Sequence, residues 1–367
     1  MEGNPVLPIV GAAVAGVVLL PLEPILGGAL LMAVNAWAFK YYREHSKLAG
    51  TFRNCGLENK DGQVLQLQER GRVEGGVMLR YSLPPGFCTA DVEKHYDRIK
   101  QHLGKDIVIS QKIKDVVIEV YDEEIEQYPF ELTAELELGK GRGKKSVILD
   151  FFKFPHLLIA GETGSGKSTL MRALITSMIL KGYKLHLIDL KGGTEFAIFK
   201  DRVESFARTE KDAIMNINLY AEKIEERYEG FFQSGVITKK TTPEVMIIDE
   251  FAELTDKETM RTISRIAALG RAASCFIVIA TQRPSADVIT GTIKNNLTNV
   301  VGLKTQNETN SRIIIDKVGL EKLRGHGHGI YKCGGEYTEF QAPLLTEERA
   351  KELLAVQVAP VFKWRFA

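Results

Sequence analysis

Two apolar runs near the N-terminus, at residues 6–22 and 24–39, meet in the segment Pro21-Leu22-Glu23-Pro24. A single helix across both runs would be about 50 Å long at 1.5 Å per residue, too long for a hydrocarbon core of about 30 Å, and it would place Glu23 at its centre. Two short helices that turn at the prolines fit a membrane better, and a buried helical hairpin in a soluble protein is the alternative. We therefore expect a transmembrane hairpin within residues 1–45.

Basic residues follow the second apolar run, at Lys40, Arg43, Lys47 and Arg53. Cytoplasmic segments next to membrane helices carry such an excess of lysine and arginine. The start of the chain, MEGN, has no positive stretch of the kind that begins a cleaved signal peptide. We therefore expect a protein of the bacterial cell membrane with two membrane helices and a cytoplasmic C-terminal part.

The pattern of residues 46–135 is that of a small α/β domain. Residues 76–81 and 117–121 have the composition and alternation of strands. Between Thr89 and Gly104, apolar positions recur at the spacing of one helix, which Thr89 can cap and Gly104 can end. No residue of this segment indicates catalysis.

From residue 136 to residue 346, short apolar strands alternate with helices. The expected strands are at residues 157–160, 185–189, 245–249, 276–280 and 300–303, and the expected helices are at 167–180, 211–231, 257–269 and 287–296. Continuously apolar strands joined by crossover helices predict a parallel sheet that is covered on both faces. The fold class is therefore α/β, a domain with a parallel sheet at residues 136–346 that is followed by a C-terminal tail at residues 347–367.

Composition adds few constraints. The chain has 48 Lys and Arg against 47 Asp and Glu, which gives a net charge of +1. This net charge does not indicate a nucleic-acid-binding protein, and it does not exclude one whose contacts to nucleic acid are few and local. The four cysteines are widely spaced, without a C-x-x-C pair or a histidine at ligand spacing. This argues against a zinc site or a disulfide framework and favours reduced thiols that face the cytosol.

The strongest chemical signal is the segment GETGSGKST, which follows the strand expected at 157–160 and opens the helix expected at 167–180. It matches the P-loop pattern G-x-x-x-x-G-K-[ST] in its strand–loop–helix context. The backbone N–H groups of such a loop bind phosphate oxygens, Lys167 reaches the β- and γ-phosphates, and the Ser168 hydroxyl is a ligand for Mg²⁺. ATP with Mg²⁺ is therefore the expected cofactor. The predicted nucleotide-binding residues are Gly161, Glu162, Thr163, Gly164, Ser165, Gly166, Lys167, Ser168 and Thr169.

Two acidic residues end the third expected strand of this domain, in the segment EVMIIDEFAEL. Asp249 is placed as a Walker B carboxylate, which holds Mg²⁺ beside Ser168, and Glu250 is placed to polarise the attacking water. The pair predicts ATP hydrolysis, while a solvated acidic pair at a strand end is the alternative. Gln282, just beyond the strand at 276–280, is the candidate sensor of the γ-phosphate.

Taken together, these motifs resemble the motor domain of the FtsK/SpoIIIE family of DNA translocases. The resemblance rests on PHLLIAGETGSGKS, VMIIDEFAEL and, most specifically, ATQRPSADVITGTIKNNL, with support from IAALGRAAS and NSRIIIDKVGLEKLRGHGHGIYK. It is strong over residues 146–331 and weaker over residues 71–120. It implies a RecA-like motor that forms a homo-oligomeric ring, a hexamer, around double-stranded DNA and moves the DNA with ATP.

The same resemblance implies roles for further residues. Arg271 and Arg312 occupy positions that match the family and are candidates for an arginine that acts on ATP in a neighbouring subunit, while an ordinary surface arginine explains either one equally well. Lys191, Arg283 and Lys294 lie in segments that resemble the loops facing the DNA channel. Simple solvation is the alternative for the two lysines.

Two features separate the chain from the division and sporulation members of the family. It ends soon after the motor, without the winged-helix domain that reads DNA polarity sequences in those proteins, and its membrane part is one short hairpin. Small members with such a hairpin resemble the coupling proteins of Gram-positive conjugative elements. We therefore expect a conjugative DNA translocase with relaxosome or transfer-channel proteins as partners. A chromosome-segregation pump and a type VII protein-secretion ATPase are the alternatives.

Overall fold

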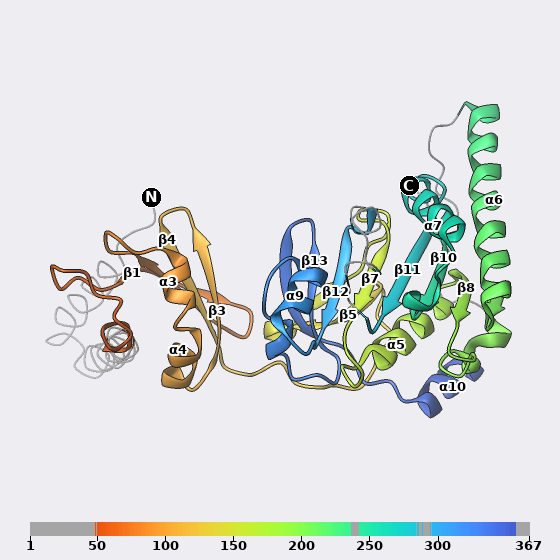
Figure 1. Cartoon of the computed structure of the whole chain (residues 1–367). Helices are drawn as coiled ribbons and strands as arrows, with labels where there is room; N and C mark the ends of the chain where they lie inside the picture. Colours follow the sequence, from red (N-terminus) through yellow and green to blue (C-terminus); the bar gives the residue numbers. More distant parts are fainter. Residues whose placement is uncertain are drawn as a thin grey trace, which may run out of the picture. The chain divides into compact units, whose positions relative to one another are not determined.

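The computed structural model describes residues 48, 50–235, 242–283, 285, 288, 294 and 296–356. The membrane hairpin expected within residues 1–45 lies outside this part of the chain. Within it, no helix combines the length and the apolar character needed to cross a membrane. The chain divides into two compact units between Glu124 and Ile125, and each unit is described by itself (Figure 1).

The first unit contains a four-stranded antiparallel sheet and two short helices. Its strands, in their order across the sheet, are β1 (Gln66–Val73), β2 (Gly76–Ser82), β4 (Asp115–Tyr121) and β3 (Asp106–Lys112), and its helices are α3 (Thr89–Glu93) and α4 (Tyr96–Leu103). Val92 and Ile99 of the helices are completely buried in one core with Ile107 and Ile118 of the sheet. The α/β character and both expected strands are confirmed.

One helix had been expected between Thr89 and Gly104, and this prediction is wrong. The chain leaves the helical conformation at His95, whose backbone angles are φ −105° and ψ 15°, so that two helices form. Gly104 ends the second one as predicted, in the left-handed conformation with φ 63°. Strands β1 and β3 were missed because their outward positions are polar and their pattern is not continuously apolar.

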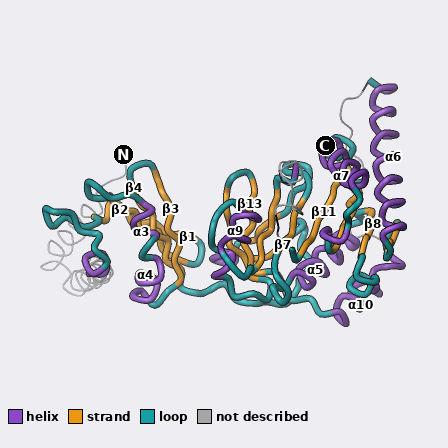
Figure 2. The backbone as a smooth tube through the Cα atoms, viewed as in Figure 1, coloured by secondary structure: helices purple, strands orange, loops and turns teal. Residues whose placement is uncertain are grey.

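In the second unit, the described residues form a ten-stranded mixed sheet (Figure 2). Its strands, in their order across the sheet, are β6 (Ser146–Ile148), β5 (Glu137–Gly141), β14 (Glu336–Gln341), β13 (His328–Cys333), β12 (Asn299–Leu303), β7 (Leu157–Ala160), β11 (Cys275–Thr281), β10 (Glu244–Asp249), β8 (Lys184–Asp189) and β9 (Ser205–Ala207). In this order, each neighbouring pair from β6 to β12 is antiparallel, and each neighbouring pair from β12 to β9 is parallel.

All five strands expected in this unit are present, and together with β9 they make the parallel part of the sheet. The antiparallel part was not expected, because strands such as β13, HGIYKC, and β14, EYTEFQ, are too polar to stand out as apolar runs. The helices are α5 (Lys167–Leu180), α6 (Glu210–Ser234), α7 (Lys257–Leu269), α9 (Glu308–Ile315) and α10 (Glu347–Val356), with short 3₁₀ turns at Arg142–Lys144, Ala197–Arg202, Phe251–Glu253 and Leu320–Lys322. The first three were predicted, and the helix expected at 287–296 lies mostly outside the described residues.

Helices cover both faces of the parallel strands, as the sequence predicts. Successive residues of a strand point to opposite faces, and the four residues of β7 divide accordingly. Leu157 and Ile159 join the core that contains α5, whereas Leu158 and Ala160 join the core that contains α6, α7 and α9. Burial on both faces explains why β7, β10, β11 and β12 are buried at every position.

Residues 125–135 belong structurally to the second unit, although the sequence placed the domain boundary after residue 135. Pro129 forms an isolated bridge with Leu344, and the Tyr128 hydroxyl donates to the Glu137 carboxylate at 3.1 Å. Phe130 packs against the small cluster that contains Leu345. A loop pattern in the sequence gives no sign of such long-range contacts.

A buried carboxylate anchors the beginning of the central strand β10. The Glu244 side chain accepts hydrogen bonds from Lys223 at 2.8 Å and from Arg227, and it lies 3.3 Å from the His186 ring. Burial by itself would raise the pKa of Glu244, but the hydrogen bonds of His186 and Lys223 and the positive charges of Arg227 and Lys223 lower it to about 2. Glu244 is therefore ionised and ties α6 to β8 and β10.

We expect Arg227→Met to destabilise the protein by about 1–3 kcal/mol, because the substitution leaves the buried Glu244 carboxylate without one of its charged donors. The measurement is the free energy of unfolding at neutral pH. Arg265→Met is the control, since the Arg265–Glu225 pair also involves α6 but is about half exposed, and it should cost less than about 1 kcal/mol. Equal effects of the two substitutions would contradict the assignment of Glu244 as an anchor.

Candidate nucleotide-binding site

The parallel register brings the ends of five strands to one edge of the sheet. Ala160, the last residue of β7, pairs with Thr281 of β11 and with Gly302 of β12, and Asp249 of β10 pairs with Asp189 of β8. Segments that follow the carboxyl ends of parallel strands therefore converge here, where open α/β sheets bind their ligands. The predicted P-loop and the predicted acidic pair both start at this edge.

Residues 161–166 form the turn from β7 into α5. Gly164 and Gly166 have φ angles of 80° and 98°, in the left-handed region that favours glycine. The N-terminus of α5 has no side-chain cap, so its first N–H groups, which lack partners within the helix, point at the loop. This arrangement of glycines and open N–H donors fits phosphate oxygens, as the sequence predicts.

The Gly-rich turn at residues 325–328 packs directly against the P-loop. The Gly327 N–H donates to the Ser165 carbonyl at 2.8 Å, and a Cβ added at Gly166 would lie 2.0 Å from the Gly327 nitrogen. The Gln341 side-chain amide also stabilises the turn, because its N–H donates to the His326 carbonyl at 2.7 Å. Gly166 is therefore required both for its backbone angle and for this close approach.

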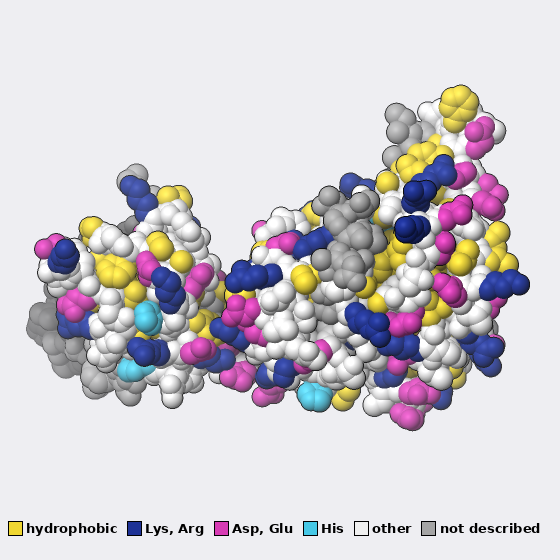
Figure 3. Space-filling view, in the orientation of Figure 1, with side chains coloured by type: hydrophobic (Ala, Val, Ile, Leu, Met, Phe, Trp, Pro, Cys, Tyr) yellow, Lys and Arg dark blue, Asp and Glu magenta, His cyan; other side chains and the backbone are white. Residues whose placement is uncertain are grey.

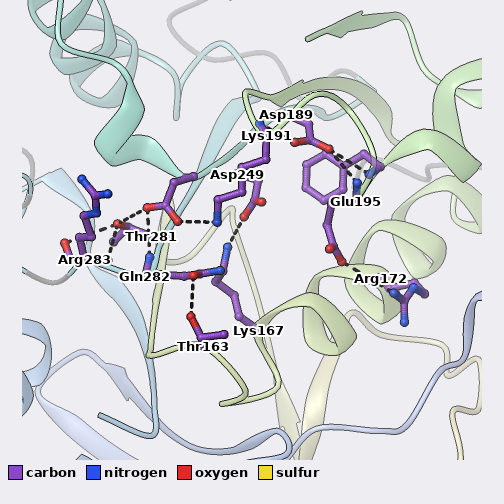
Figure 4. A network of polar contacts seen from close by, with 12 residues as sticks. Thr163, Lys167, Arg172, Asp189, Lys191, Glu195, Asp249, Thr281, Gln282 and Arg283 are labelled. Atoms are coloured by element: carbon purple, nitrogen blue, oxygen red, sulfur yellow. Dashed lines mark hydrogen bonds and ion pairs between the residues drawn. The ribbon is translucent and has the colours of Figure 1, made fainter. Parts of the chain in front are cut away.

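Lys167 and Asp249 form a buried ion pair within the site (Figure 4). The lysine amine donates to Oδ1 of Asp249, and each side chain is 4% exposed. Ser168 follows Lys167 on the first turn of α5. The described residues contain no group of three or more acidic, His or Cys ligands, but Mg²⁺ in phosphate-transfer sites uses one or two protein oxygens with phosphates and waters. Ser168 and Asp249 fit that requirement.

Glu250 is buried and held in an unusual conformation. Its backbone angles, φ 56° and ψ 64°, are left-handed for a non-glycine residue, which costs on the order of 1–3 kcal/mol. Oε1 accepts hydrogen bonds from the Thr281 hydroxyl at 3.0 Å and the Gln282 N–H at 3.2 Å, and Oε2 accepts from the Lys191 amine at 2.9 Å. Burial by itself would raise the pKa of Glu250, but these donors lower it, so the carboxylate is ionised.

Gln282 joins Glu250 to the P-loop. Its backbone N–H donates to Glu250, while its side-chain oxygen accepts a hydrogen bond of 3.0 Å from the Thr163 hydroxyl (Figure 4). Thr163 lies in the P-loop, so a change in the loop on phosphate binding has a direct route to Glu250. The position of Gln282 fits the predicted sensor.

The side chains of Arg271, Arg312 and Lys294 have their contacts outside this network. Arg271 donates to the Phe152 carbonyl at 3.1 Å, and Arg312 forms an exposed ion pair with Glu308 at 3.7 Å. Lys294 pairs with Asp316 at 2.6 Å. Arg283 is exposed, and its backbone N–H donates to the Thr281 hydroxyl at 3.1 Å. Of the three residues predicted to contact DNA, Lys191 is the one whose side chain bonds to Glu250.

Asp189 is a site residue that the sequence analysis missed. It is completely buried, and its carboxylate accepts hydrogen bonds from the backbone N–H groups of Lys191 at 3.1 Å and Glu195 at 2.9 Å. It therefore fixes the loop that carries Lys191. The signal was present, because the strand LHLID ends in an aspartate just as VMIID does, and parallel neighbours end at the same edge.

Comparisons with known proteins agree with this site. Residues 122–246 match the model of the FtsK/SpoIIIE family. The chain is 32% identical over 360 residues to the DNA translocase FtsK of Staphylococcus aureus strain Mu50, a match that covers 85% of this chain and 44% of that protein. The chain spans less than half the length of the curated relatives that it matches.

Two solved structures share the fold. The conjugation coupling protein TcpA of pCW3, in its monomer form with ATPγS, has a TM-score of 0.61 at 23% identity, covering 85% of this chain and 98% of that one. The cytoplasmic domain of the type VII secretion ATPase EccC from Thermomonospora curvata has a TM-score of 0.53 at 20% identity, covering 64% and 32%. At these identities the likeness bears on the fold alone.

We expect Gly166→Ala to weaken ATP binding about tenfold or more, because the new Cβ overlaps the backbone of Gly327 and the left-handed angle is strained, at a cost of at least 1–3 kcal/mol. Titration with a fluorescent ATP analogue measures the effect. Gly104→Ala is the control, since Gly104 also has a positive φ but has open space around it. An unchanged ATP affinity of Gly166→Ala would contradict the requirement for glycine and show that the turn at 325–328 can move away at little cost.

Proposed function

Because the chain belongs to the FtsK/SpoIIIE family, we propose that it is a membrane-anchored, ATP-driven translocase of double-stranded DNA. The observation that carries the proposal is the continuous network from Lys167 and Asp249 to Glu250 and Gln282 at one edge of the sheet. A protein that only bound ATP would not need an ionised glutamate with a strained backbone next to the Walker B aspartate.

Each residue of this network has a role in hydrolysis of the γ-phosphate. Lys167 would bind the β- and γ-phosphates, and Ser168 and Asp249 would hold Mg²⁺, which neutralises developing charge when bound. Glu250 would accept a hydrogen bond from the attacking water and orient it toward the phosphorus atom. Gln282 would report the state of the P-loop to Glu250 through Thr163.

DNA as the substrate is supported by the relatives with more than 30% identity, which are DNA translocases. Figure 3 shows acidic and basic side chains interspersed over the visible face of the second unit, in agreement with the net charge of +1 of the whole chain. Contacts to DNA would therefore be few in each subunit and repeated around a homo-oligomeric ring, for which we propose six subunits. Arg271 or Arg312 would reach ATP in the neighbouring subunit.

We propose delivery of DNA to a conjugative transfer channel as the biological role, with relaxosome or channel proteins as partners. Two observations support it: the apolar hairpin pattern before residue 45 and the fold shared with a conjugation coupling protein over nearly all of its length. A chromosome-segregation pump would use the same site. The fold shared with EccC keeps a protein-secretion ATPase as the second candidate.

The test of the enzymatic proposal is the steady-state ATPase rate of the full chain in detergent, with and without double-stranded DNA. We expect several-fold stimulation by DNA, and Glu250→Gln should lower the stimulated rate by about 10²–10⁴-fold because the amide is a poor acceptor for the proton of water. A wild-type ATPase rate that is the same with and without DNA would contradict the DNA translocase and favour the secretion ATPase.

Removal of residues 1–45 should transfer the protein from the membrane fraction to the soluble fraction, because these residues carry the apolar runs. The measurement is fractionation of cells that express either form, with the intact chain extracted by detergent but not by high salt. A truncated protein that stays with the membrane would overturn the anchor.

A further inference from the structure

Lys191 connects the buried carboxylate of Glu250 to the protein surface. The two side chains form an ion pair of 2.9 Å, in which Lys191 is 40% exposed and Glu250 is 3% exposed. The lysine amine can therefore reach an anion in solution, whereas the carboxylate cannot reach a cation there without losing its buried contacts. Lys191 is therefore the member of the pair that a partner in solution can contact.

The backbone of Lys191 is held in place while its side chain is exposed. Asp189 accepts a hydrogen bond from the Lys191 N–H, and Gly192 and Gly193 follow with φ angles of 84° and 77°. Gly192 has no Cβ, and no atom lies within 4 Å of the position that a Cβ would take, so a large partner can approach the loop closely here. A rotation of the lysine side chain is then sufficient to break the pair.

The ion pair occupies the oxygen that hydrolysis needs. Oε1 of Glu250 already accepts hydrogen bonds from Thr281 and Gln282, so Oε2 is the oxygen left to accept a proton of water, and the Lys191 amine bonds to it. The Lys191 amine, 2.9 Å from Oε2, blocks one approach of a water molecule to this oxygen. In this arrangement, the Lys191 amine hinders the attacking water from bonding to Oε2 of Glu250.

A polyanion can compete for the lysine amine, because Lys191 is the exposed member of the pair. When the amine leaves, the buried Glu250 carboxylate keeps its bonds to Thr281 and Gln282, and the attacking water takes the third place. Binding of a lysine to a DNA phosphate gains from release of the counterions condensed on the duplex, which is a favourable term of its own. A phosphodiester placed at this loop therefore competes with Glu250 for the amine.

We propose that Lys191 is a positioning residue that couples DNA contact to ATP hydrolysis. Without DNA its amine restrains Glu250, and a phosphate of double-stranded DNA draws the amine away and frees Oε2 for the attacking water. The inference rests on the proposed function, and it goes beyond a DNA contact because it predicts that loss of Lys191 activates the enzyme.

The test compares ATPase rates of the full-length wild type and Lys191→Met, each with and without double-stranded DNA. Lys191→Met should hydrolyse ATP several-fold faster than the wild type when DNA is absent, and DNA should stimulate it little. Lys191→Arg keeps a cation at this position and should restore the low rate and part of the stimulation. Lys351→Met removes a lysine from an exposed ion pair with Glu347 and should change neither rate.

Further variants separate the mechanism from simpler explanations. Lys191→Met combined with Glu250→Gln should show no activation, because the effect acts through Glu250. Binding of a fluorescent ATP analogue shows that each variant is folded, and Lys191→Gln replaces Lys191→Met if the latter is not. The affinity for labelled double-stranded DNA, measured with ATPγS, separates loss of DNA binding from loss of coupling.

Each other outcome overturns the proposal in a distinct way. A fall in the DNA-free rate of Lys191→Met would make Lys191 a group that hydrolysis requires. An unchanged DNA-free rate with weaker DNA binding would make it a DNA contact alone. If DNA fails to stimulate the wild type, the proposed function fails; activation of Lys191→Met in that case would retain the restraint on Glu250 and exclude DNA as its release.

Discussion

The hydrogen-bond register of the parallel strands is the constraint on which the site depends. Because β7 pairs with β11, and β10 pairs with both β11 and β8, the chain segments after these strands emerge side by side. Lys167, Asp189, Asp249 and Thr281 are far apart in the sequence, and the strand order brings the segments that carry them together. Lys167 bonds to Asp249, and Thr281 bonds to Glu250. A shift of one residue in any strand would turn its last side chain to the other face.

Burial of charge follows from this convergence and is balanced within the network. Lys167 and Asp249 neutralise each other, while Glu250 has one charged and two neutral donors. Each buried carboxylate would be costly if it were left unpaired. A bound nucleotide would have to replace these internal partners by its own phosphates and cation, so binding and rearrangement of the network are a single event.

The antiparallel half of the sheet contributes to the site through a different route. Strand β13 begins at His328, the last residue of the turn at 325–328, and the Gly327 carbonyl accepts a hydrogen bond from the N–H of Ala342, just beyond β14. The same turn donates to the P-loop at Ser165. Support for the phosphate-binding loop therefore comes from the antiparallel half of the sheet, which lies outside the P-loop and the Walker B segment.

Local sequence determined most of the parallel strands and the chemistry of the site, because these signals are short in range. The P-loop pattern located Gly161 to Thr169, continuous apolar runs located β7, β8, β10, β11 and β12, and the acidic pair after β10 identified Asp249 and Glu250. Only the tertiary structure decided which partner each side chain has. Lys191 bonds to Glu250, Thr163 bonds to Gln282, and Gly327 contacts Ser165 because strand pairing, which no local pattern encodes, places these distant residues together.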